Sequence, residues 1–413
     1  MGPKQRNRAR GVTNPRGGRS GRMPHRADDP TGRQDPPTIL AVPPVAQPTV
    51  SVVMVTFGEH LWAERTIGAL IRITEPVYEL IVIDNASRDG TGEWLMENVV
   101  GARIVVNEEN VGFGSACNQG AAMARGRLLL FLNPDVLVEP GWLDPLIAAI
   151  ELSPETVAVG PLLLNLDGSL QIAGALIDGS GATACYGIGD HDADRPEYRY
   201  RRRVDYLAGA CLMVERAAFD SVGGFDARYS PAYFEDADLC LELSAHGGNV
   251  VLVPRSRVRH VGDVSGGSRT LRTVAEHHRD LLAERWSHVL TCRPAHPIEG
   301  SPRRLLAARD APAELRVLVL SRDTEGFEIL LRHHPEVAIT IMDHECPDDR
   351  LECVPWDVSW HRWLYDRRFH YDLIVGAPDD LEDLLDETQP QAVRSRALDT
   401  DTFLQVGVPW MQL

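Results

Sequence analysis

Continuous apolar runs alternate with segments of helical periodicity from Thr49 onward. The runs that predict strands are TVSVVMVTF (49–57), YELIVID (78–84), ARIVVN (102–107) and RLLLFLN (127–133). Their β-branched and aliphatic residues suit strands that are covered on both faces. Apolar or small residues recur at helical spacing in LWAERTIGALIRI (61–73), GEWLMENV (92–99) and GSACNQGAAMARG (114–126). Strands that alternate with helices predict βαβ units and an α/β fold whose mainly parallel sheet is flanked by helices.

Polar residues follow three of these strands at the points where the apolar runs end. The three places are Thr56–Phe57, Asp84–Asn85 and Asn133–Asp135, where polar residues interrupt the runs. In sheets of this kind the ligand lies beyond the carboxyl ends of the strands. These three positions therefore predict the edge of the sheet at which a site forms.

The pattern changes after the fourth strand. Residues 165–205 read as loop and short strands because they are rich in Gly, Asp and Arg, whereas 206–229 predict a strand, a short helix and a Gly-Gly turn. An acidic start and a closing Gly247 predict a helix over 233–248. Residues 249–262 predict a strand followed by a loop, and TLRTVAEHHRDLLAERW predicts a helix of about twenty residues.

Composition divides the chain into four parts. Residues 1–48 are rich in Arg, Gly and Pro and predict a disordered basic arm, either a solvated tail or a contact for anionic lipid or RNA. Residues 49–292 form the predicted main domain, and the Pro-, Arg- and Ala-rich stretch 293–313 reads as a linker. Residues 314–413 predict a smaller α/β module without a catalytic cluster, which could dock a partner or join two copies in a homo-oligomer.

Charge and composition exclude several functional classes. The chain has 413 residues, 44% of them hydrophobic, and a formal charge of −17, as expected for a globular protein with an acidic surface. An acidic body argues against nucleic-acid binding. We find neither an apolar run near the ~18 residues of a membrane span nor a secretory leader, and the seven scattered cysteines indicate reduced thiols. We therefore expect a cytoplasmic protein whose membrane contact, if any, is peripheral, on the inner face of the plasma membrane.

The Asn133-Pro134-Asp135 turn is the first candidate for chemistry. Proline ends the strand and fixes the direction of Asp135. Taken alone, this is an ordinary turn.

A second group of candidates makes a metal site more plausible. Glu235, Asp236 and Asp238 crowd at a helix start, where a cation or donors must offset their charges. His260 follows a strand, and together with Asp135 it could complete an oxygen and nitrogen site for Mn²⁺ or Mg²⁺.

Taken together, the motifs resemble family 2 glycosyltransferases of the GT-A fold, in the bacterial rhamnosyltransferase-like branch. They are SVVMVTF, LIVIDNASRDGT, NEENVGFGSACNQGAAMARGRLLLFLNPDVLVEPGWL, YLAGACLMVERAAFDSVGGFDARYSPAYFEDADLCLEL and VPRSRVRHVGDVSGGS, and they span roughly residues 49–290. The resemblance implies a Rossmann-like mixed sheet and an inverting, metal-dependent transferase. Its donor would be a dTDP- or UDP-sugar, with rhamnose implied by the branch. Its acceptor would be a hydroxyl of a glycan, of a lipid-linked molecule or of a small molecule.

Roles follow by matched position. The resemblance implies a nucleotide-sugar site made of Thr56, Asp84, Asn85, Gly112, Asn118 and Asn133. Asp135 and His260 would hold Mn²⁺ or Mg²⁺ with diphosphate oxygens and water, because Asn133 replaces the first acid of the family's DxD motif. Asp236 matches the catalytic base, and Glu235, together with partial burial, would raise its pKa.

Two other functions stay open. A nucleotidyltransferase would need a glycine-rich, basic loop after the first strand, and VTFGEHLWAE is acidic there. A non-catalytic scaffold would work through the arm and the 314–413 module, but the set Asp84, Asp135, Asp236 and His260 favours an enzyme.

The acceptor is expected against the variable segment 165–205. That segment carries Tyr186, His191, Tyr198 and the basic run 199–203. The run is either a solvated face or a contact for a phosphate on the acceptor.

Overall fold

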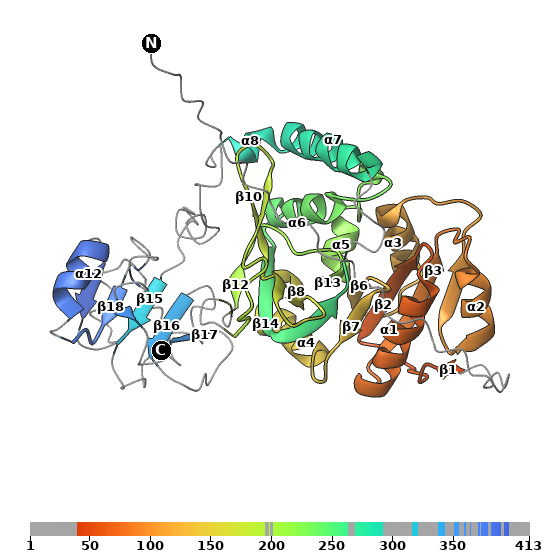
Figure 1. Cartoon of the computed structure of the whole chain (residues 1–413), viewed down its shortest axis with the longest axis horizontal. Coiled ribbons are helices and arrows are strands. Elements are labelled where there is room, and N and C mark those ends of the chain that lie inside the picture. The colour runs from red at the N-terminus through yellow and green to blue at the C-terminus, as the bar shows by residue number, and fades with distance from the viewer. Residues whose placement is uncertain are drawn as a thin grey trace, which may run out of the picture. The chain divides into compact units, whose positions relative to one another are not determined.

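The computed structural model describes the main part of the chain and several pieces of its C-terminal part (Figure 1). The described residues are 39–194, 198, 201–262, 269–291, 316–320, 338–342, 351–354, 359–360, 364, 371, 373–378, 381–389 and 392–395. The predicted linker 293–313 and residues 1–38 of the predicted arm lie outside them. The rest of that arm is described, and Leu40–Ala41 form strand β1, which pairs in parallel with β4 (Val99–Val100). The prediction of disorder is therefore wrong for these two residues, whose main chain pairs with β4.

A ten-stranded mixed sheet forms the centre of the main domain. Its strands are β2 (Val50–Thr56), β3 (Tyr78–Asp84), β5 (Arg103–Val106), β6 (Leu128–Leu132), β7 (Val136–Val138), β8 (Thr156–Leu164), β9 (Leu170–Ile172), β12 (Arg202–Arg203), β13 (Cys211–Glu215) and β14 (Asn249–His260). The order is β12-β14-β8-β13-β6-β2-β3-β5, with β7 paired to β14 and β9 to β8. Strands β6, β2, β3 and β5 are parallel, whereas β13 is antiparallel to both of its neighbours. The predicted mixed, mainly parallel α/β sheet is confirmed.

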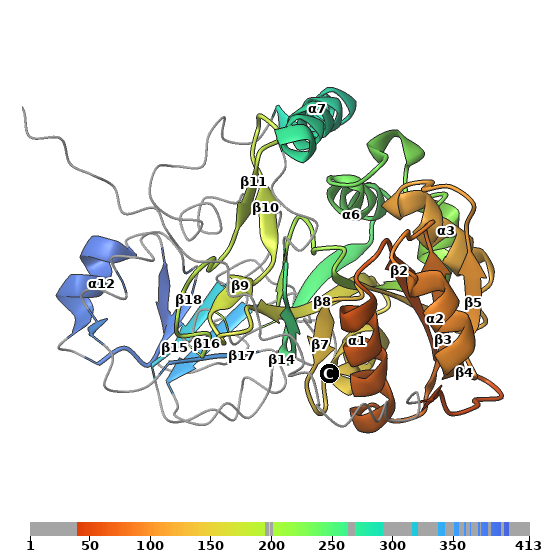
Figure 2. The ribbon, with the colours of Figure 1, turned by 45° about the vertical axis from the view of Figure 1, so that its right-hand side comes forward.

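Helices cover both faces of this sheet (Figure 2). They are α1 (His60–Ile73), α2 (Thr91–Asn98), α3 (Phe113–Ala122), α4 (Leu143–Leu152), α5 (Arg216–Ser221) and α6 (Glu235–Ala245), and two further helices, α7 (Arg269–Arg285) and α8 (Ser287–Leu290), follow β14. Alternate residues of a strand point to opposite faces, so β2 contributes to two cores. Val53 belongs to a buried cluster that includes residues of α3, α5 and α6, and Val52 belongs to one that includes residues of α1, α2 and α4. Coverage of both faces explains why the strands read as unbroken apolar runs.

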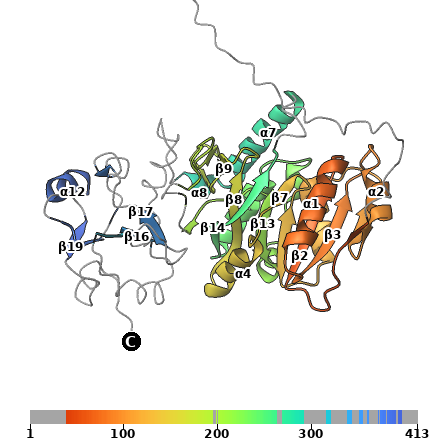
Figure 3. The same cartoon turned by 60° about the horizontal axis from the view of Figure 1, so that its bottom comes forward.

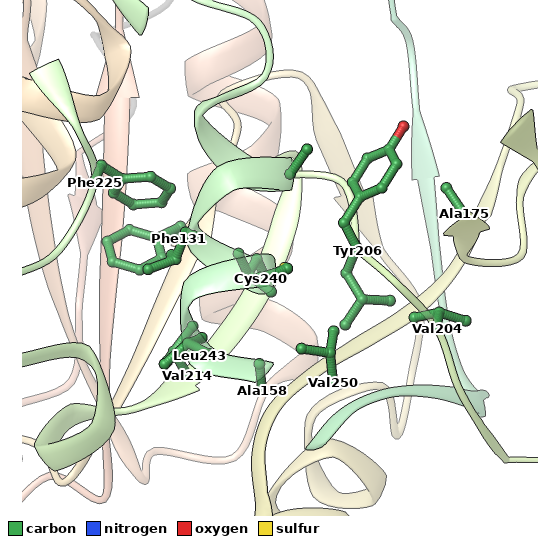
Figure 4. Packing of buried hydrophobic residues seen from close by; sticks show 14 of the residues in the cluster. Phe131, Ala158, Ala175, Val204, Tyr206, Val214, Phe225, Cys240, Leu243 and Val250 are labelled. Atoms are coloured by element: carbon green, nitrogen blue, oxygen red, sulfur yellow. The ribbon is translucent and has the colours of Figure 1, made fainter. Parts of the chain in front are cut away.

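Aromatic packing joins the sheet to the segment that precedes α6 (Figure 4). Phe131 of β6 meets Phe225 edge to face, with ring centroids 4.8 Å apart. Burial of one such ring stabilises the fold by about 1.5–3 kcal/mol. The acidic start of α6 is thereby anchored near the carboxyl end of β6.

The strand and following loop predicted for 249–262 are present, with the strand as β14, which ends at His260. Its register against β8 is irregular between Val253 and Arg257. The short strand β7 pairs with the end of β14, where His260 is opposite Val136. This pairing brings His260 beside the Asn133-Pro134-Asp135 turn.

The C-terminal part contains a sheet of its own. Its five parallel strands, β15 (Arg316–Val319), β16 (Ala338–Met342), β17 (Leu351–Val354), β18 (Leu373–Val375) and β19 (Val393–Ser395), have the order β17-β16-β15-β18-β19, and α12 (Glu382–Thr388) accompanies them. This order is that of a doubly wound α/β sheet. The α/β character expected for 314–413 agrees with it, while the domain boundaries and the docking role stay predictions.

Two further expectations concern cysteines and the membrane. Cys117, Cys185, Cys211 and Cys240 are free, but Cys353 is disulfide-bonded, so the expectation of reduced thiols throughout is wrong. Within the described ranges, every helix is too short or too polar to cross a bilayer. Figure 3 shows the helices of the main domain from a second direction.

Candidate active site

Thr56 and Asp84 meet at the carboxyl ends of β2 and β3. These residues are directly paired in the sheet, and the Thr56 hydroxyl donates to Asp84 Oδ1 at 2.9 Å. The same carboxylate accepts from the hydroxyl and from the main-chain N–H of Ser87. Because Asp84 is only 1% exposed, its carboxylate is enclosed and organises the turn that follows β3.

The side chain of Asn85 holds the loop 107–112. Its Nδ2 donates to Asn110 Oδ1 at 2.8 Å and to the Gly112 carbonyl at 3.3 Å. Its Oδ1 accepts from Asn107 Nδ2 and from the Val111 N–H, both at 3.1 Å. Asn85 therefore shapes the loop over the sheet edge.

Gly112 and Asn118 are also occupied by contacts within the protein. Gly112 has φ of 88°, and an added Cβ would lie 2.5 Å from Ser230 Oγ, so only glycine fits. The Asn118 amide donates to the Phe225 carbonyl at 2.8 Å and accepts from the Phe225 N–H at 2.9 Å. The structure thus gives Thr56, Asp84, Asn85 and Asn118 a role in shaping the site, and their contact with a donor stays a prediction.

Asp135 and His260 come together as predicted. His260 Nε2 lies 3.3 Å from Asp135 Oδ1 and 3.5 Å from Asn133 Nδ2. The Gly262 N–H donates to Asp135 Oδ2 at 3.2 Å, which leaves Oδ1 facing the ring. Asp135 is 5% exposed, so this arrangement is held inside the protein.

The spacing of this pair fits two ligands of one cation. Neighbouring ligands of an octahedral ion with bonds near 2.0–2.1 Å are separated by about 3 Å. Within the described ranges, no group of three or more His, Cys, Asp or Glu side chains could hold a metal ion. Asp135 and His260 would therefore supply two ligands, with diphosphate oxygens and water completing the shell, as is common for Mg²⁺.

Glu59 is a nearby acid that the sequence did not single out. Burial raises its pKa to about 7, the charge of Asp135 adds to the rise, and His260 opposes it. Glu59 has left-handed backbone, with φ of 68°, at the start of α1. In the sequence Glu59 is one of two acids in the segment VTFGEHLWAE, and no neighbouring residue distinguishes it as a member of the site.

A cavity of about 450 Å³ brings His260, one member of the candidate metal pair, together with the acidic helix start. Asn133, His260, Glu235 and Asp236 all line it. Most of the other lining residues are apolar, aromatic or glycine: Phe113, Ile172, Tyr206, Ala208, Gly209, Ala210, Ala232, Tyr233, Phe234 and Ala237. Mostly apolar walls with a few converging polar groups are typical of a small-molecule site.

Asp236 lies in the first turn of α6. Its Oδ2 accepts from the Gly209 N–H at 2.9 Å and its Oδ1 from the Ala237 N–H at 2.8 Å. Burial raises the pKa of Asp236, and these two hydrogen bonds oppose the rise. The candidate base is therefore more basic than an exposed aspartate.

Glu235 is the more protonated member of the acidic pair. It is 6% exposed, and its Oε2 has no hydrogen-bond partner in the part of the chain that the structure describes. Burial, followed by the charge of Asp236, raises its pKa well above the usual range. We expected Glu235 to raise the pKa of Asp236; burial is the main cause of that rise, and Asp236 in turn acts on Glu235.

Asp238 does not belong to the site. Its carboxylate accepts from Tyr229 at 3.1 Å and from Trp286 Nε1 at 2.8 Å, and it pairs with Arg285 at 2.5 Å. The cation that offsets this acid is an arginine of α7.

His278 of α7 supports the segment before α6. Tyr233 and Phe234 have φ of 78° and 73°, a left-handed conformation that is costly for side chains of this size. His278 Nδ1 lies 3.1 Å from the Ala232 carbonyl and 3.0 Å from that of Tyr233. Since carbonyl oxygens only accept, Nδ1 of His278 carries the hydrogen. Its hydrogen bonds to the two carbonyls stabilise the strained segment.

The basic run 199–203 is partly described. Arg202 is buried, donates to the Ala173 carbonyl at 3.0 Å and lies 4.4 Å above the Tyr186 ring. This arginine is therefore a core residue, while residues 199–200 lie outside the described ranges.

Comparison with known proteins gives relatives for most of this domain. A family model described as Glycosyl transferase family 2 matches residues 51–220. The chain is 33% identical over 263 residues to the N-acetylglucosaminyl-diphospho-decaprenol L-rhamnosyltransferase of Mycobacterium tuberculosis, covering 57% of this chain and 84% of that protein. It is 29% identical over 264 residues to the O-antigen biosynthesis protein RfbC of Myxococcus xanthus, covering 62% of this chain and 20% of that protein.

A solved structure is also similar. GalNAc-T7 with UDP, GalNAc and Mn²⁺ is 22% identical, with a TM-score of 0.47 over 62% of this chain and 53% of that chain. Asp236 and His260 lie beyond the residues that the family model matches, so their assignment depends on the geometry described above.

Proposed function

The chain belongs to glycosyl transferase family 2, in its rhamnosyltransferase-like branch, and we propose that it transfers a sugar with inversion from a nucleotide-diphospho-sugar to an acceptor hydroxyl. The observation that supports this proposal is that Asn133, His260, Glu235 and Asp236 line one cavity. The cavity places His260, which lies 3.3 Å from Asp135, in one space with the candidate base, and a cation and a base are the two chemical functions that such a transfer needs.

Asp236 acts as the base. Its carboxylate takes the proton of the acceptor hydroxyl while the acceptor oxygen bonds to the anomeric carbon. The bond from that carbon to the diphosphate oxygen breaks, and the nucleoside diphosphate leaves with the bonding electrons. One displacement from the opposite face inverts the configuration, so no protein nucleophile is required.

Asp135 and His260 would hold Mn²⁺ or Mg²⁺. When bound, the cation supplies positive charge against the charge that develops on the leaving diphosphate. Asn133 lies 3.5 Å from the His260 ring and lines the cavity, where its amide could donate to a diphosphate oxygen.

The donor and acceptor are inferred from the named relative. That protein is an L-rhamnosyltransferase acting on an N-acetylglucosaminyl-diphospho-decaprenol. We therefore infer dTDP-rhamnose as the first donor to test and a lipid-linked sugar diphosphate as the first acceptor. A lipid-linked acceptor would bring the enzyme to the inner face of the plasma membrane as a peripheral protein.

Nucleoside diphosphate release tests the proposal. The purified full chain is incubated with dTDP-rhamnose or UDP-sugars, Mn²⁺ and a lipid acceptor, with Asp236→Asn and the exposed control Asp220→Asn in parallel. We expect turnover in the wild type and in Asp220→Asn, and loss in Asp236→Asn. Normal turnover by Asp236→Asn would refute the role of Asp236 as the base. Undiminished activity of the wild type in the presence of a chelator would refute the requirement for a metal ion.

A further inference from the structure

Gln171 links the variable segment 165–205 to the candidate metal pair. It lies on β9, and its Oε1 is 2.8 Å from His260 Nδ1. Its Nε2 lies 3.2 Å from the His260 carbonyl and 3.1 Å from Asn165 Oδ1. A main-chain carbonyl can only accept, so the amide nitrogen must face it and the amide oxygen must face the histidine ring.

This orientation determines which ring nitrogen carries hydrogen. Gln171 Oε1 is an acceptor, so His260 Nδ1 must be the donor. In the neutral ring, Nε2 then presents a lone pair toward Asp135 Oδ1 at 3.3 Å. Two lone pairs directed at each other repel, and either a second ring proton, which makes an ion pair with Asp135, or a cation bound by both atoms removes that repulsion.

We propose that Gln171 is a positioning residue that holds His260 in the tautomer and orientation needed to bind a divalent cation through Nε2. It acts through the histidine and makes no contact with the cation itself. Strand β9 pairs with β8 on either side of Gln171, through Leu170 and Ile172, which keeps the amide in place. The inference rests on the proposed function, because it assumes that Asp135 and His260 form the metal site.

Mn²⁺ affinity provides a test that does not depend on turnover. Free Mn²⁺ is followed by electron paramagnetic resonance while the full chain is titrated in the presence of dTDP and, in a second series, UDP. The variants are Gln171→Leu, which removes the acceptor, and Gln171→Glu, which keeps one. His260→Ala reports on the site itself, and Gln47→Leu is the control, because Gln47 is exposed and precedes the amino end of β2.

The expected result is a graded loss. Removing an outer partner of a ligand typically weakens metal binding about 10–100-fold, so we expect that loss in Gln171→Leu. Gln171→Glu keeps the acceptor for Nδ1 but places its second oxygen against the His260 carbonyl, so it should lose less affinity than Gln171→Leu, and Gln47→Leu should bind as wild type does. Thermal unfolding midpoints of all variants show whether the fold is intact.

Four outcomes would overturn the inference. Equal affinity in Gln171→Leu and wild type, with weak binding in His260→Ala, refutes the role of Gln171 and leaves the metal site standing. Equal loss in Gln171→Leu and Gln171→Glu refutes the hydrogen-bond acceptor as the cause. If His260→Ala binds as well as wild type, or the wild type binds no Mn²⁺, the metal site fails and the inference falls with it.

Discussion

Asp236 Oδ2 accepts a 2.9 Å hydrogen bond from the main-chain N–H of Gly209, which ties the proposed base to the segment that leads into β13. The bond fixes the direction of the carboxylate at the cavity wall. It also favours the charged form, whereas burial favours the protonated form more strongly. The result is an oriented carboxylate with a raised pKa, which is what a general base for a sugar hydroxyl requires.

The pH dependence of turnover should report this raised pKa. A base must be deprotonated, so activity should fall as pH decreases through the pKa of Asp236, at a higher pH than for an exposed aspartate. Asp236→Asn should lower the rate about 10²–10⁴-fold without an acidic limb. Initial rates of nucleoside diphosphate release between pH 4 and 8 would check this, and a wild-type profile that is flat down to pH 4 would contradict it.

Glu235 should make the protein less stable as pH rises. A carboxyl whose pKa is raised on folding stabilises the fold at pH values below its unfolded pKa, and that contribution is lost as pH rises through the folded pKa. Glu235→Gln replaces it with a neutral side chain of the same shape, so the loss should disappear. Urea unfolding midpoints at pH 5 and pH 8 measure the effect. A variant that loses as much stability as wild type over this range would refute the explanation.

Glu59 should also make the protein less stable as pH rises, but over a narrower pH range than Glu235. Its pKa rises from 4.5 to about 7, so its contribution is lost between these values as pH increases. After allowance for its partial exposure, Glu59→Gln should be more stable than wild type at pH 8 by an amount on the order of 1 kcal/mol. Glu97→Gln, an exposed acid on α2, is the control and should leave the pH dependence unchanged. A Glu59→Gln protein that unfolds like the control would show that Glu59 is more solvated than its pKa implies.

His278 should matter for both stability and turnover. Two carbonyls of the strained segment before α6 depend on its Nδ1–H, so His278→Ala should cost about 1–3 kcal/mol of stability. Because that segment precedes Asp236, kcat should fall more than donor KM changes. His277→Ala, the exposed neighbour on α7, is the matched control. Equal effects of the two substitutions would mean that α7 contributes only general packing.

The meeting of the strand ends was predictable because it follows from sheet geometry. Parallel strands bring their carboxyl ends to one edge, which places Thr56 against Asp84. Asn133 and His260 are 127 residues apart in the chain and still meet at 3.5 Å. That meeting depends on β7 pairing with the last residues of β14, which the sequence did not reveal.

The sequence did not predict the directions in which the side chains of the candidate site point. An amide such as Asn85 or Asn118 can face a ligand or a neighbouring loop, and only the folded partners decide between them. The same holds for Asp238, which turns to Arg285 although its neighbour Asp236 faces the cavity. The residues around Gln171 in the sequence do not indicate its role, because its partner, His260, lies on a strand 89 residues further along the chain.

Gly112 provides a test of how tightly the loop over the sheet edge is built. An alanine there would combine a left-handed backbone with a Cβ only 2.5 Å from Ser230 Oγ, so Gly112→Ala should destabilise the protein by about 2–4 kcal/mol. Gly223 has nearly the same φ, 83°, but no atom of the described residues within 4 Å of an added Cβ. Gly223→Ala should therefore cost only about 1–2 kcal/mol from backbone strain.

The difference between these two variants isolates the steric contact. Urea unfolding gives both values, and donor binding by thermal shift shows whether the loop moves in the folded protein. We expect Gly112→Ala, and not Gly223→Ala, to weaken donor binding, because displacement of Ser230 would move the segment that leads into α6. Equal destabilisation of the two variants would mean that Ser230 moves aside at no cost in stability. The loop 107–112 would then not be closely packed against the segment that leads into α6.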